Sequence, residues 1–160
     1  MHPNEQLIHT FYTAFKNSDP AGMAACYHAD VDFSDPVFPA LHGNRARAMW
    51  ALLGQRKADP NDRWFEAVRA DDARGTAHWE AKYKFPATGR PVHNRIDAAF
   101  EFADGKIRRH TDSFDFWAWS RQAFGVTGLV LGWGPLKRPV RKRLAKMLDE
   151  FIETHPEFRG

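Results

Sequence analysis

The sequence has 160 residues, enough for one domain with a self-sufficient hydrophobic core. Aromatic residues make up 14% of it, with 13 Phe and 6 Trp, which indicates either a wide core or a cavity for an apolar ligand. The net charge is only +3 and its excess forms a basic tail near the C-terminus, so a nucleic-acid-binding function, which needs a basic face, is not expected.

Composition and residue spacing make several other kinds of site and protein unexpected. The single cysteine, Cys26, allows neither an internal disulfide nor a Cys-based zinc site. The eight histidines never occur as His-x-His or His-x-x-x-His, and no phosphate-binding glycine loop is present, so we expect no metal and no cofactor. Residues 1–5 lack a signal-peptide pattern, and the apolar run around 129–131 is too short to span a bilayer. We therefore expect a cytoplasmic protein.

The first part of the chain is predicted to be helical. One helical face carries apolar residues at the spacing i, i+1, i+4 and i+8, namely Leu7, Ile8, Phe11 and Phe15. Asn4 is the candidate N-cap of this helix. Asp19 is expected to cap a second, short helix that starts with Pro20 and ends at about Tyr27.

A strand over residues 31–35 follows and stops at Pro36, and a third helix is predicted from about residue 44 to Gly54. After Pro60 the pattern changes to strands separated by turn residues, including the Asp104-Gly105 hairpin turn. The four predicted strands cover residues 63–70, 76–85, 92–102 and 106–116. Three helices followed by a meander indicate an α+β fold.

The tail after Trp117 is predicted to be helical and then basic. Its last helix carries one apolar stripe, formed by Val140, Leu144, Met147, Leu148, Phe151 and Ile152. We expect this helix to pack on its own domain with a solvated charged face; binding to a membrane surface is the weaker alternative. We make no structural prediction for segment 125–135, which is rich in glycine and apolar residues.

Two motifs carry a family resemblance. The first runs from Asn17-Ser18-Asp19-Pro20 through His28-x-Asp30-Val31-x-Phe33-x-Asp35-Pro36 to Leu41-x-Gly43, and the second is Phe100-x-Phe102-x-Asp104-Gly105-Lys106-Ile107 followed by His110-x-Asp112. Together they resemble the SnoaL-like polyketide cyclases, the ketosteroid isomerases and the limonene-type epoxide hydrolases. The resemblance implies the nuclear-transport-factor-2-like fold, a cone-shaped curved antiparallel sheet packed on N-terminal helices. We assign residues 1–117 to this domain and 118–160 to a helical extension of it.

Strand alternation selects the acids that face the expected pocket. Asp35 shares a face with Val31 and Phe33, and the segment that it begins resembles the general-base segment of the isomerases. His110 and Asp112 share a face of the last strand, and the resemblance places the catalytic acid of the cyclases and epoxide hydrolases at Asp112. Asp112, Asp35 and His110 are therefore the candidate catalytic residues. Their structural alternatives stay open: a turn for Asp35, a satisfied backbone group for Asp112, and a core histidine for His110.

The same alternation predicts which residues line the pocket. Trp79 and Tyr83 face inward from one strand, and Phe114 continues the face of Asp112. Asn94 shares the inward face of its strand, whereas Asp97 faces outward although the resemblance places an isomerase acid near it. The epoxide hydrolases carry an Arg and an Asp two residues apart on the strand of Trp79, and this chain has only His78-x-Glu80, facing outward.

The steroid-isomerase mechanism is not expected. The resemblance places Phe11 where those enzymes have the tyrosine of their oxyanion hole, and a phenyl ring cannot donate a hydrogen bond. Tyr12 lies about 100° further around the helix and does not replace that tyrosine directly. We expect Phe11 to line the wall of the pocket.

The sequence supports two kinds of function. The first is cofactor-independent acid/base chemistry of the isomerase, cyclase or hydrolase type on a small, cyclic, hydrophobic molecule. The alternative is a non-catalytic module that binds a ligand or a partner. Because many proteins of this fold pair through the outer face of the sheet, a homodimer is expected with either function.

Overall fold

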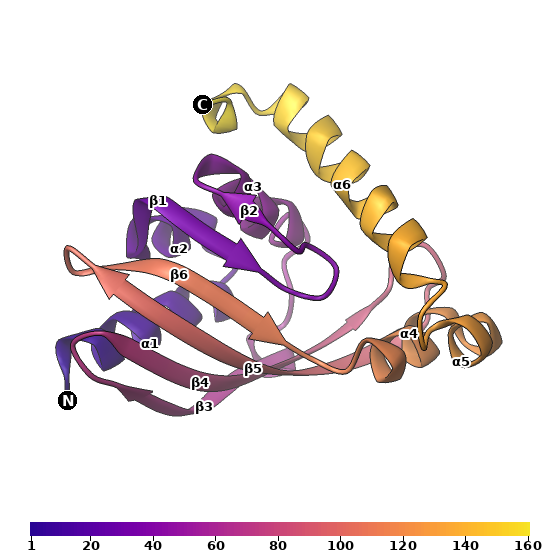
Figure 1. Ribbon diagram of the computed structural model, residues 1–160, viewed down its shortest axis with the longest axis horizontal. Helices are drawn as coiled ribbons and strands as arrows, with labels where there is room; N and C mark the ends of the chain where they lie inside the picture. The colour runs from indigo at the N-terminus through magenta and orange to yellow at the C-terminus, as the bar shows by residue number, and fades with distance from the viewer.

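A curved, open, six-stranded sheet with helices on one face forms the body of the molecule in the computed structural model, which describes all 160 residues (Figure 1). The helices are α1 (Pro3–Lys16), α2 (Pro20–Cys26), α3 (Asn44–Leu53), α4 (Phe116–Phe124), α5 (Val126–Leu131) and α6 (Lys137–Thr154). The strands are β1 (Tyr27–Ser34), β2 (Leu41–His42), β3 (Arg63–Ala70), β4 (Arg74–Lys84), β5 (Pro91–Ala103) and β6 (Lys106–Ser113). Short 3₁₀ turns cover Pro60–Asp62 and Pro156–Phe158. The α+β prediction is confirmed.

The strands lie in the order β2-β1-β6-β5-β4-β3. Every neighbouring pair is antiparallel except β1 and β6, which run parallel. The sheet is therefore mixed, not purely antiparallel as expected. A tight hairpin forces its two strands to be antiparallel, but α3 and four further strands separate β1 from β6 in the chain, so no such turn fixes their relative direction.

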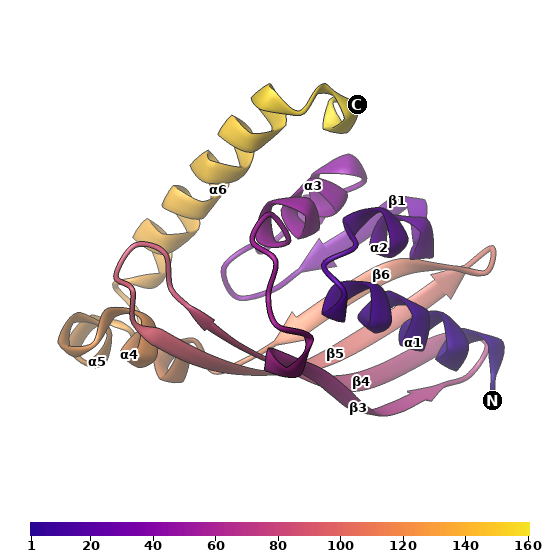
Figure 2. The same cartoon turned by 180° about the vertical axis from the view of Figure 1, so that it is seen from behind.

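Helices α1, α2 and α3 cover one face of the sheet (Figure 2). The N-cap of α1 is His2 and not Asn4, as the sequence had suggested. The His2 ring accepts the Asn4 backbone N–H at 3.1 Å, while the Glu5 carboxylate accepts the His2 N–H at 3.3 Å. This reciprocal pair starts the helix two residues earlier. The Asp19 cap of α2 is confirmed, because its carboxylate accepts the Gly22 N–H at 2.9 Å.

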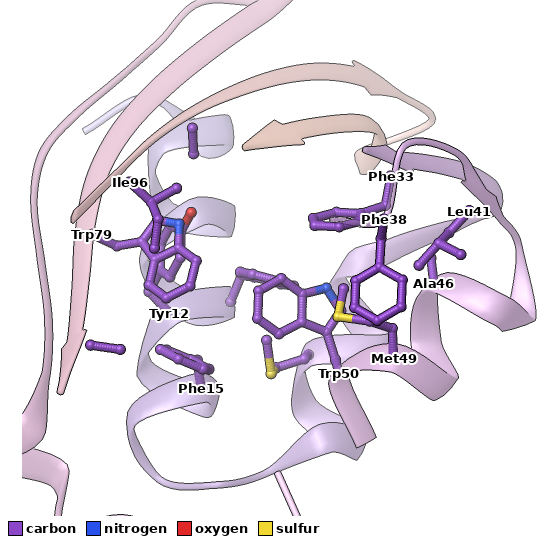
Figure 3. Close-up of a cluster of buried hydrophobic side chains, with 14 of the residues drawn as sticks. Tyr12, Phe15, Phe33, Phe38, Leu41, Ala46, Met49, Trp50, Trp79 and Ile96 are labelled. Carbon is purple, nitrogen blue, oxygen red and sulfur yellow. The ribbon is translucent and has the colours of Figure 1, made fainter. Parts of the chain in front are cut away.

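Alternation along the two long strands is as predicted. The buried side of β4 carries Ala77, Trp79 and Ala81, and that of β5 carries Ile96, Ala98 and Phe100. These side chains belong to a core of 32 apolar residues between the sheet and the helices, part of which is shown in Figure 3. Outward-facing polar residues occupy the positions between them, and Asp97 is among the exposed ones.

Two strand boundaries differ from the prediction. Strand β1 begins at Tyr27, four residues before the expected start, because α2 ends one residue earlier. Strand β6 ends at Ser113, so Phe114 and Phe116 are not part of it. The Asp115 carboxylate accepts the Ala118 N–H at 3.1 Å and starts α4 instead. The hairpin turn is confirmed, with positive φ at Asp104 and Gly105.

The C-terminal helices extend from the far end of the sheet. Helices α4 and α5 lie beside the ends of β4 and β5, and α6 runs back from them toward α3 (Figure 1). Three residues of the predicted stripe on α6 are buried, namely Val140, Leu148 and Phe151. An ion pair of 2.8 Å between Arg45 and Asp149 joins α6 to α3. None of the helices combines the length and apolarity needed to cross a membrane.

Candidate functional site

A row of hydrogen-bonded side chains crosses the interior between the helices and the sheet. The Trp50 indole N–H donates to the Tyr27 hydroxyl at 2.8 Å, and that hydroxyl lies 2.8 Å from His110 Nδ1. His110 Nε2 lies 2.8 Å from Asp112 Oδ1, which also accepts the Trp79 indole N–H at 3.3 Å. All five residues are buried. We call this set, Trp50, Tyr27, His110, Asp112 and Trp79, the buried relay.

The donors and acceptors of the buried relay follow from its two ends. An indole N–H can only donate, so the Tyr27 oxygen accepts from Trp50, and its own proton is available to His110 Nδ1. With the ring proton on Nε2, the imidazole accepts from Tyr27 and donates to Asp112. This arrangement satisfies every bond of the relay.

Asp112 presents one free oxygen. Its Oδ1 accepts both N–H donors, whereas Oδ2 takes no hydrogen bond from the chain. The residue is 4% exposed and lies on the face of β6 that meets the core. Two donors on the same oxygen fix the direction of the carboxylate, which is the arrangement that a general base requires.

The Tyr12 hydroxyl lies in the same interior without a partner. It is the one fully buried side-chain N or O atom that makes no hydrogen bond. Burial raises the pKa of Tyr12 well above its usual value, and the charge of Asp112 raises it further, so the two groups lie close enough to interact. Figure 3 shows Tyr12 beside Trp79, and their rings are 6.0 Å apart.

Phe11 and Tyr12 are both fully buried. Tyr12 lies about 100° further around α1 than Phe11, but its hydroxyl does not reach the surface. Phe11 stacks on Tyr27 at 5.2 Å and meets the His110 ring edge-on at 5.4 Å. It packs against the buried relay from the helix side.

Asp35 follows the end of β1 and forms the turn that the sequence left open as its structural alternative. Its Oδ1 accepts the backbone N–H groups of Val37 at 2.7 Å and Phe38 at 2.6 Å. Desolvation nevertheless raises the pKa of Asp35 to about 7, and the charge of Asp112 adds to the rise. Asp35 and Asp112 therefore influence each other electrostatically across the interior.

Tyr83 belongs to the same region. Its hydroxyl accepts the Trp119 indole N–H at 2.9 Å. Desolvation raises the pKa of Tyr83 to about 12, with a further contribution from the charge of Asp35, although the residue is 39% exposed. A phenol that is both desolvated and reachable by solvent lies in a recessed part of the surface, open on one side.

Two remaining candidates lie at the margin of this region. Phe114 is partly buried, and its ring centre is 6.4 Å from that of Trp119. Asn94 is partly buried on β5 opposite Ala81, which lies between Trp79 and Tyr83 on β4. Neither residue makes a hydrogen bond to the buried relay.

Two shallow surface hollows accompany the site. The larger has a volume of about 460 Å³ and includes Tyr83, Val92 and Gln122 in its lining. The other, about 270 Å³, lies over the loop that joins β1 to β2. Neither is lined by Asp112, Asp35 or His110.

The outer face of the sheet carries a second polar cluster. His78 binds the Asp97 carboxylate through Nδ1 at 2.8 Å and the Glu80 carboxylate through Nε2 at 2.9 Å. Glu80 also contacts His93, and Arg95 lies 3.6 Å from it. The sheet separates this cluster from Asp112, so Asp97 takes no part in the interior site.

Sequence reasoning did not select Tyr27 or Trp50 as site residues. Tyr27 was placed at the end of a helix, where strand alternation does not apply. Its hydroxyl bridges Trp50, 23 positions away, and His110, 83 positions away. The pairing of tyrosine with tryptophan has no local signature, so only the start of β1 at Tyr27 could have drawn attention to it.

The fold and the interior site together define a class of protein: the nuclear-transport-factor-2-like α+β fold, with polar side chains between the curved sheet and its helices. The SnoaL-like domain family matches residues 8–110. The chain belongs to the SnoaL-like domain family.

Several solved structures share this fold. A presumed polyketide cyclase from Xanthomonas campestris pv. campestris is 24% identical, with a TM-score of 0.59 over 75% of this chain and 96% of that one. An epoxide hydrolase of the LEH-like type from M. tuberculosis is 20% identical, with a TM-score of 0.60 over 81% and 93%. TerC, co-crystallized with polyporic acid, is 19% identical, with a TM-score of 0.62 over 76% and 98%. A comparison with curated proteins found no significant match.

Proposed function

We propose that this protein is a cofactor-independent enzyme that performs acid/base chemistry on a small, cyclic, hydrophobic molecule, as an isomerase, cyclase or hydrolase. The buried relay ending at Asp112 is the observation that carries this proposal. Asp112 Oδ2 takes no hydrogen bond from the chain and, unlike the Tyr12 hydroxyl, is not fully enclosed, so it stays available to a small molecule. The proposal is supported by the resemblance of the sequence motifs to the cyclases and epoxide hydrolases, which implies a catalytic acid at Asp112.

Asp112 Oδ2 acts as the base in this proposal. It removes a proton alpha to a substrate carbonyl, or it takes a proton from a water molecule that attacks the substrate. The N–H groups of His110 and Trp79 hold Oδ1 and keep the carboxylate aligned. The proton then returns from Oδ2 to the product, so no external acid is consumed.

Tyr12 supplies the hydrogen bond for the oxygen on which negative charge develops. A buried hydroxyl without a partner costs about 1–3 kcal/mol, and a substrate oxygen would remove that penalty. A donor that is already oriented and free of water is most effective in the transition state. This role differs from that of the isomerase tyrosine, since Phe11 occupies that position.

Asp35 is the second acid/base group. Its pKa of about 7 keeps both protonation states populated near neutral pH. We place the substrate entrance between Tyr83, whose pKa is raised in part by the charge of Asp35, and the 35–40 loop, which Arg141 of α6 joins by donating to the Pro36 carbonyl at 2.8 Å. In this proposal Tyr83, Phe114 and Asn94 line the entrance, and Trp79 and Phe11 lie deeper.

A ligand screen tests the proposal. Thermal shift of the purified protein against polyketides, steroids, terpenes and their epoxides detects binding, and a ligand at about 100 times its Kd adds roughly 2.7 kcal/mol. We expect a shift with at least one ring class and turnover of that compound. Asp112→Asn should abolish turnover, and Tyr12→Phe should reduce it by about tenfold or more.

Asp97→Asn is the matched control, because it makes the same chemical change on the outer face of the sheet. Its turnover and its ligand-induced shift should equal those of the unaltered protein. Turnover that survives in Asp112→Asn would refute the catalytic proposal. Loss of turnover in Asp97→Asn as well would assign the effect to stability and not to chemistry.

A non-catalytic binding module is the second candidate. The observation that favours it is the near-complete burial of the relay, with neither surface hollow lined by Asp112. In this proposal two copies pair through the outer face of the sheet, which no helix covers (Figure 1). If this proposal holds, sedimentation equilibrium should show a dimer that Glu80→Lys dissociates. No compound of the panel should then give a thermal shift.

A further inference from the structure

The apolar side chains of α5 and of the turn after it lie on the surface. Val126, Leu129, Val130 and Trp133 are 76%, 51%, 58% and 75% exposed. A helix of a water-soluble domain normally turns such side chains toward the core. Helix α5 does the opposite.

The packing of α5 on α4 explains this orientation. A Cβ atom on Gly128 would overlap the Ser120 carbonyl oxygen, and one on Gly132 would overlap the Ser120 hydroxyl. The two helices touch through these glycines, which leaves the larger side chains of α5 facing away. The Trp117 indole N–H also donates to the Leu129 carbonyl at 3.2 Å. The outward face of α5 is therefore fixed by close contacts.

Positive charge surrounds this apolar face. Between Asp115 and Asp149 the chain has seven Lys or Arg and no Asp or Glu, whereas the rest has 16 Lys or Arg against 20 Asp or Glu. Among the seven, Arg138, Lys142 and Arg143 are exposed and form no ion pair with an acidic side chain. Figures 1 and 2 show α4, α5 and the start of α6 together at one end of the molecule, far from the N-terminus.

We propose that this end of the molecule, formed by α5, Trp133 and the first half of α6, binds the surface of an anionic lipid membrane. The four apolar side chains enter the boundary between headgroups and acyl chains, and the free lysines and arginines contact lipid phosphates. An exposed tryptophan next to aliphatic and basic side chains is the composition that such an interface favours. At six residues, α5 is too short to do more than lie in the interface.

The positive charge of this end of the molecule also favours a membrane, and not a second copy of the chain, as the binding partner. A symmetric pair formed through this end would bring two unscreened basic segments together, because no acidic residue lies between 116 and 148. An anionic lipid surface neutralises those charges and covers the apolar side chains at the same time.

Vesicle co-sedimentation of the full-length protein tests the proposal. We expect binding to phosphatidylcholine vesicles that contain phosphatidylglycerol, and binding weaker by about tenfold or more to pure phosphatidylcholine. Leu129→Glu should weaken binding to the anionic vesicles by about tenfold or more, since it removes one inserted side chain and adds a repelled charge. Arg138→Glu combined with Lys142→Glu should weaken it by a similar factor.

Leu53→Glu provides the matched control. Leu53 is 50% exposed on α3, as exposed as Leu129. Figure 1 shows α3 away from α5, so this variant should bind vesicles as the unaltered protein does. Absence of binding to anionic vesicles would overturn the proposal, as would equal binding by Leu129→Glu. A size-exclusion profile in which Leu129→Glu converts a dimer to a monomer, with vesicle binding unchanged, would overturn it in favour of a contact between copies.

Discussion

Asp35 combines a structural and a chemical role in one side chain. Its Oδ1 closes the turn after β1 by accepting two backbone N–H groups. These bonds favour the charged carboxylate, but desolvation outweighs them and raises the pKa of Asp35 to about 7. The raised pKa means that the folded state prefers the neutral acid. The stability gained from this group is full below its ordinary pKa of 3.8 and is lost as the pH rises through about 7.

Asp35→Asn should therefore raise the stability of the protein at alkaline pH. The amide oxygen still accepts both backbone N–H groups, while the charge that burial disfavours is gone. We expect the free energy of unfolding to increase by about 1 kcal/mol above pH 7, discounted for the partial exposure of the side chain, and to be unchanged in acid. Urea unfolding at several pH values measures this difference. A loss of stability at alkaline pH would show that the carboxylate charge is stabilising.

The two buried tyrosines make a matched pair for testing the relay. The Tyr27 hydroxyl has two partners, Trp50 and His110, whereas the Tyr12 hydroxyl has none. Tyr27→Phe should lower the free energy of unfolding by about 1–3 kcal/mol, because it leaves a buried indole N–H and an imidazole nitrogen unpaired. Tyr12→Phe should leave stability unchanged or raise it. Equal losses in the two variants, measured by urea unfolding, would argue against the relay.

At the scale of elements, the long hairpin of β4 and β5 separates two polar environments. Its inner face carries Trp79 of the buried relay, and its outer face carries His78 between two carboxylates. Hydrogen bonds donated by the ring to Asp97, and then to Glu80, raise the pKa of His78. The stabilising contribution of this imidazolium is therefore full below its ordinary pKa of 6.5 and is lost as the pH rises through the raised value.

Asp97→Asn should lower the pKa of His78, because it replaces the charged partner that contributes most to the rise. An NMR titration of the His78 ring in both proteins measures the change. An unchanged pKa of His78 would mean that Glu80 alone is responsible.

At the scale of the whole molecule, the C-terminal helices are part of the same hydrophobic core as the sheet. Trp119, Val140, Leu148 and Phe151 are all buried, and the Trp119 indole N–H binds Tyr83 of β4. Helix α6 then ties the end of the sheet to α3. We propose that residues 118–160 extend the same domain, because these contacts join them to its core.

Truncation after Trp117 should consequently weaken the remaining domain. It removes six buried side chains and exposes their contacts, so we expect a loss of about 5 kcal/mol or more in the free energy of unfolding. Guanidinium unfolding followed by circular dichroism measures it, and a second truncation after Leu136 separates the contribution of α6 from that of α4 and α5. An unchanged midpoint in the shorter chain would make the extension a separate unit.

Local patterns in the sequence determined much of this protein. Alternation along β4 and β5 placed Trp79 inward and Asp97 outward, because successive side chains of a strand point to opposite faces. The same rule put His110 and Asp112 on one interior face. Turn and cap residues located α2 and the β5–β6 hairpin. Boundaries differ from the prediction where two elements compete for one residue, as at Tyr27 and Phe116.

Only the tertiary structure decided what the interior acids contact. The relay joins Tyr27 to His110 across 83 positions, and the parallel pairing of β1 with β6 brings those two strands together. The pKa of Asp35, the unpaired hydroxyl of Tyr12 and the outward face of α5 likewise depend on neighbours that are distant in sequence. Hydrogen bonding and desolvation act over a few ångströms in space, and a chain folded on itself sets those distances independently of sequence separation.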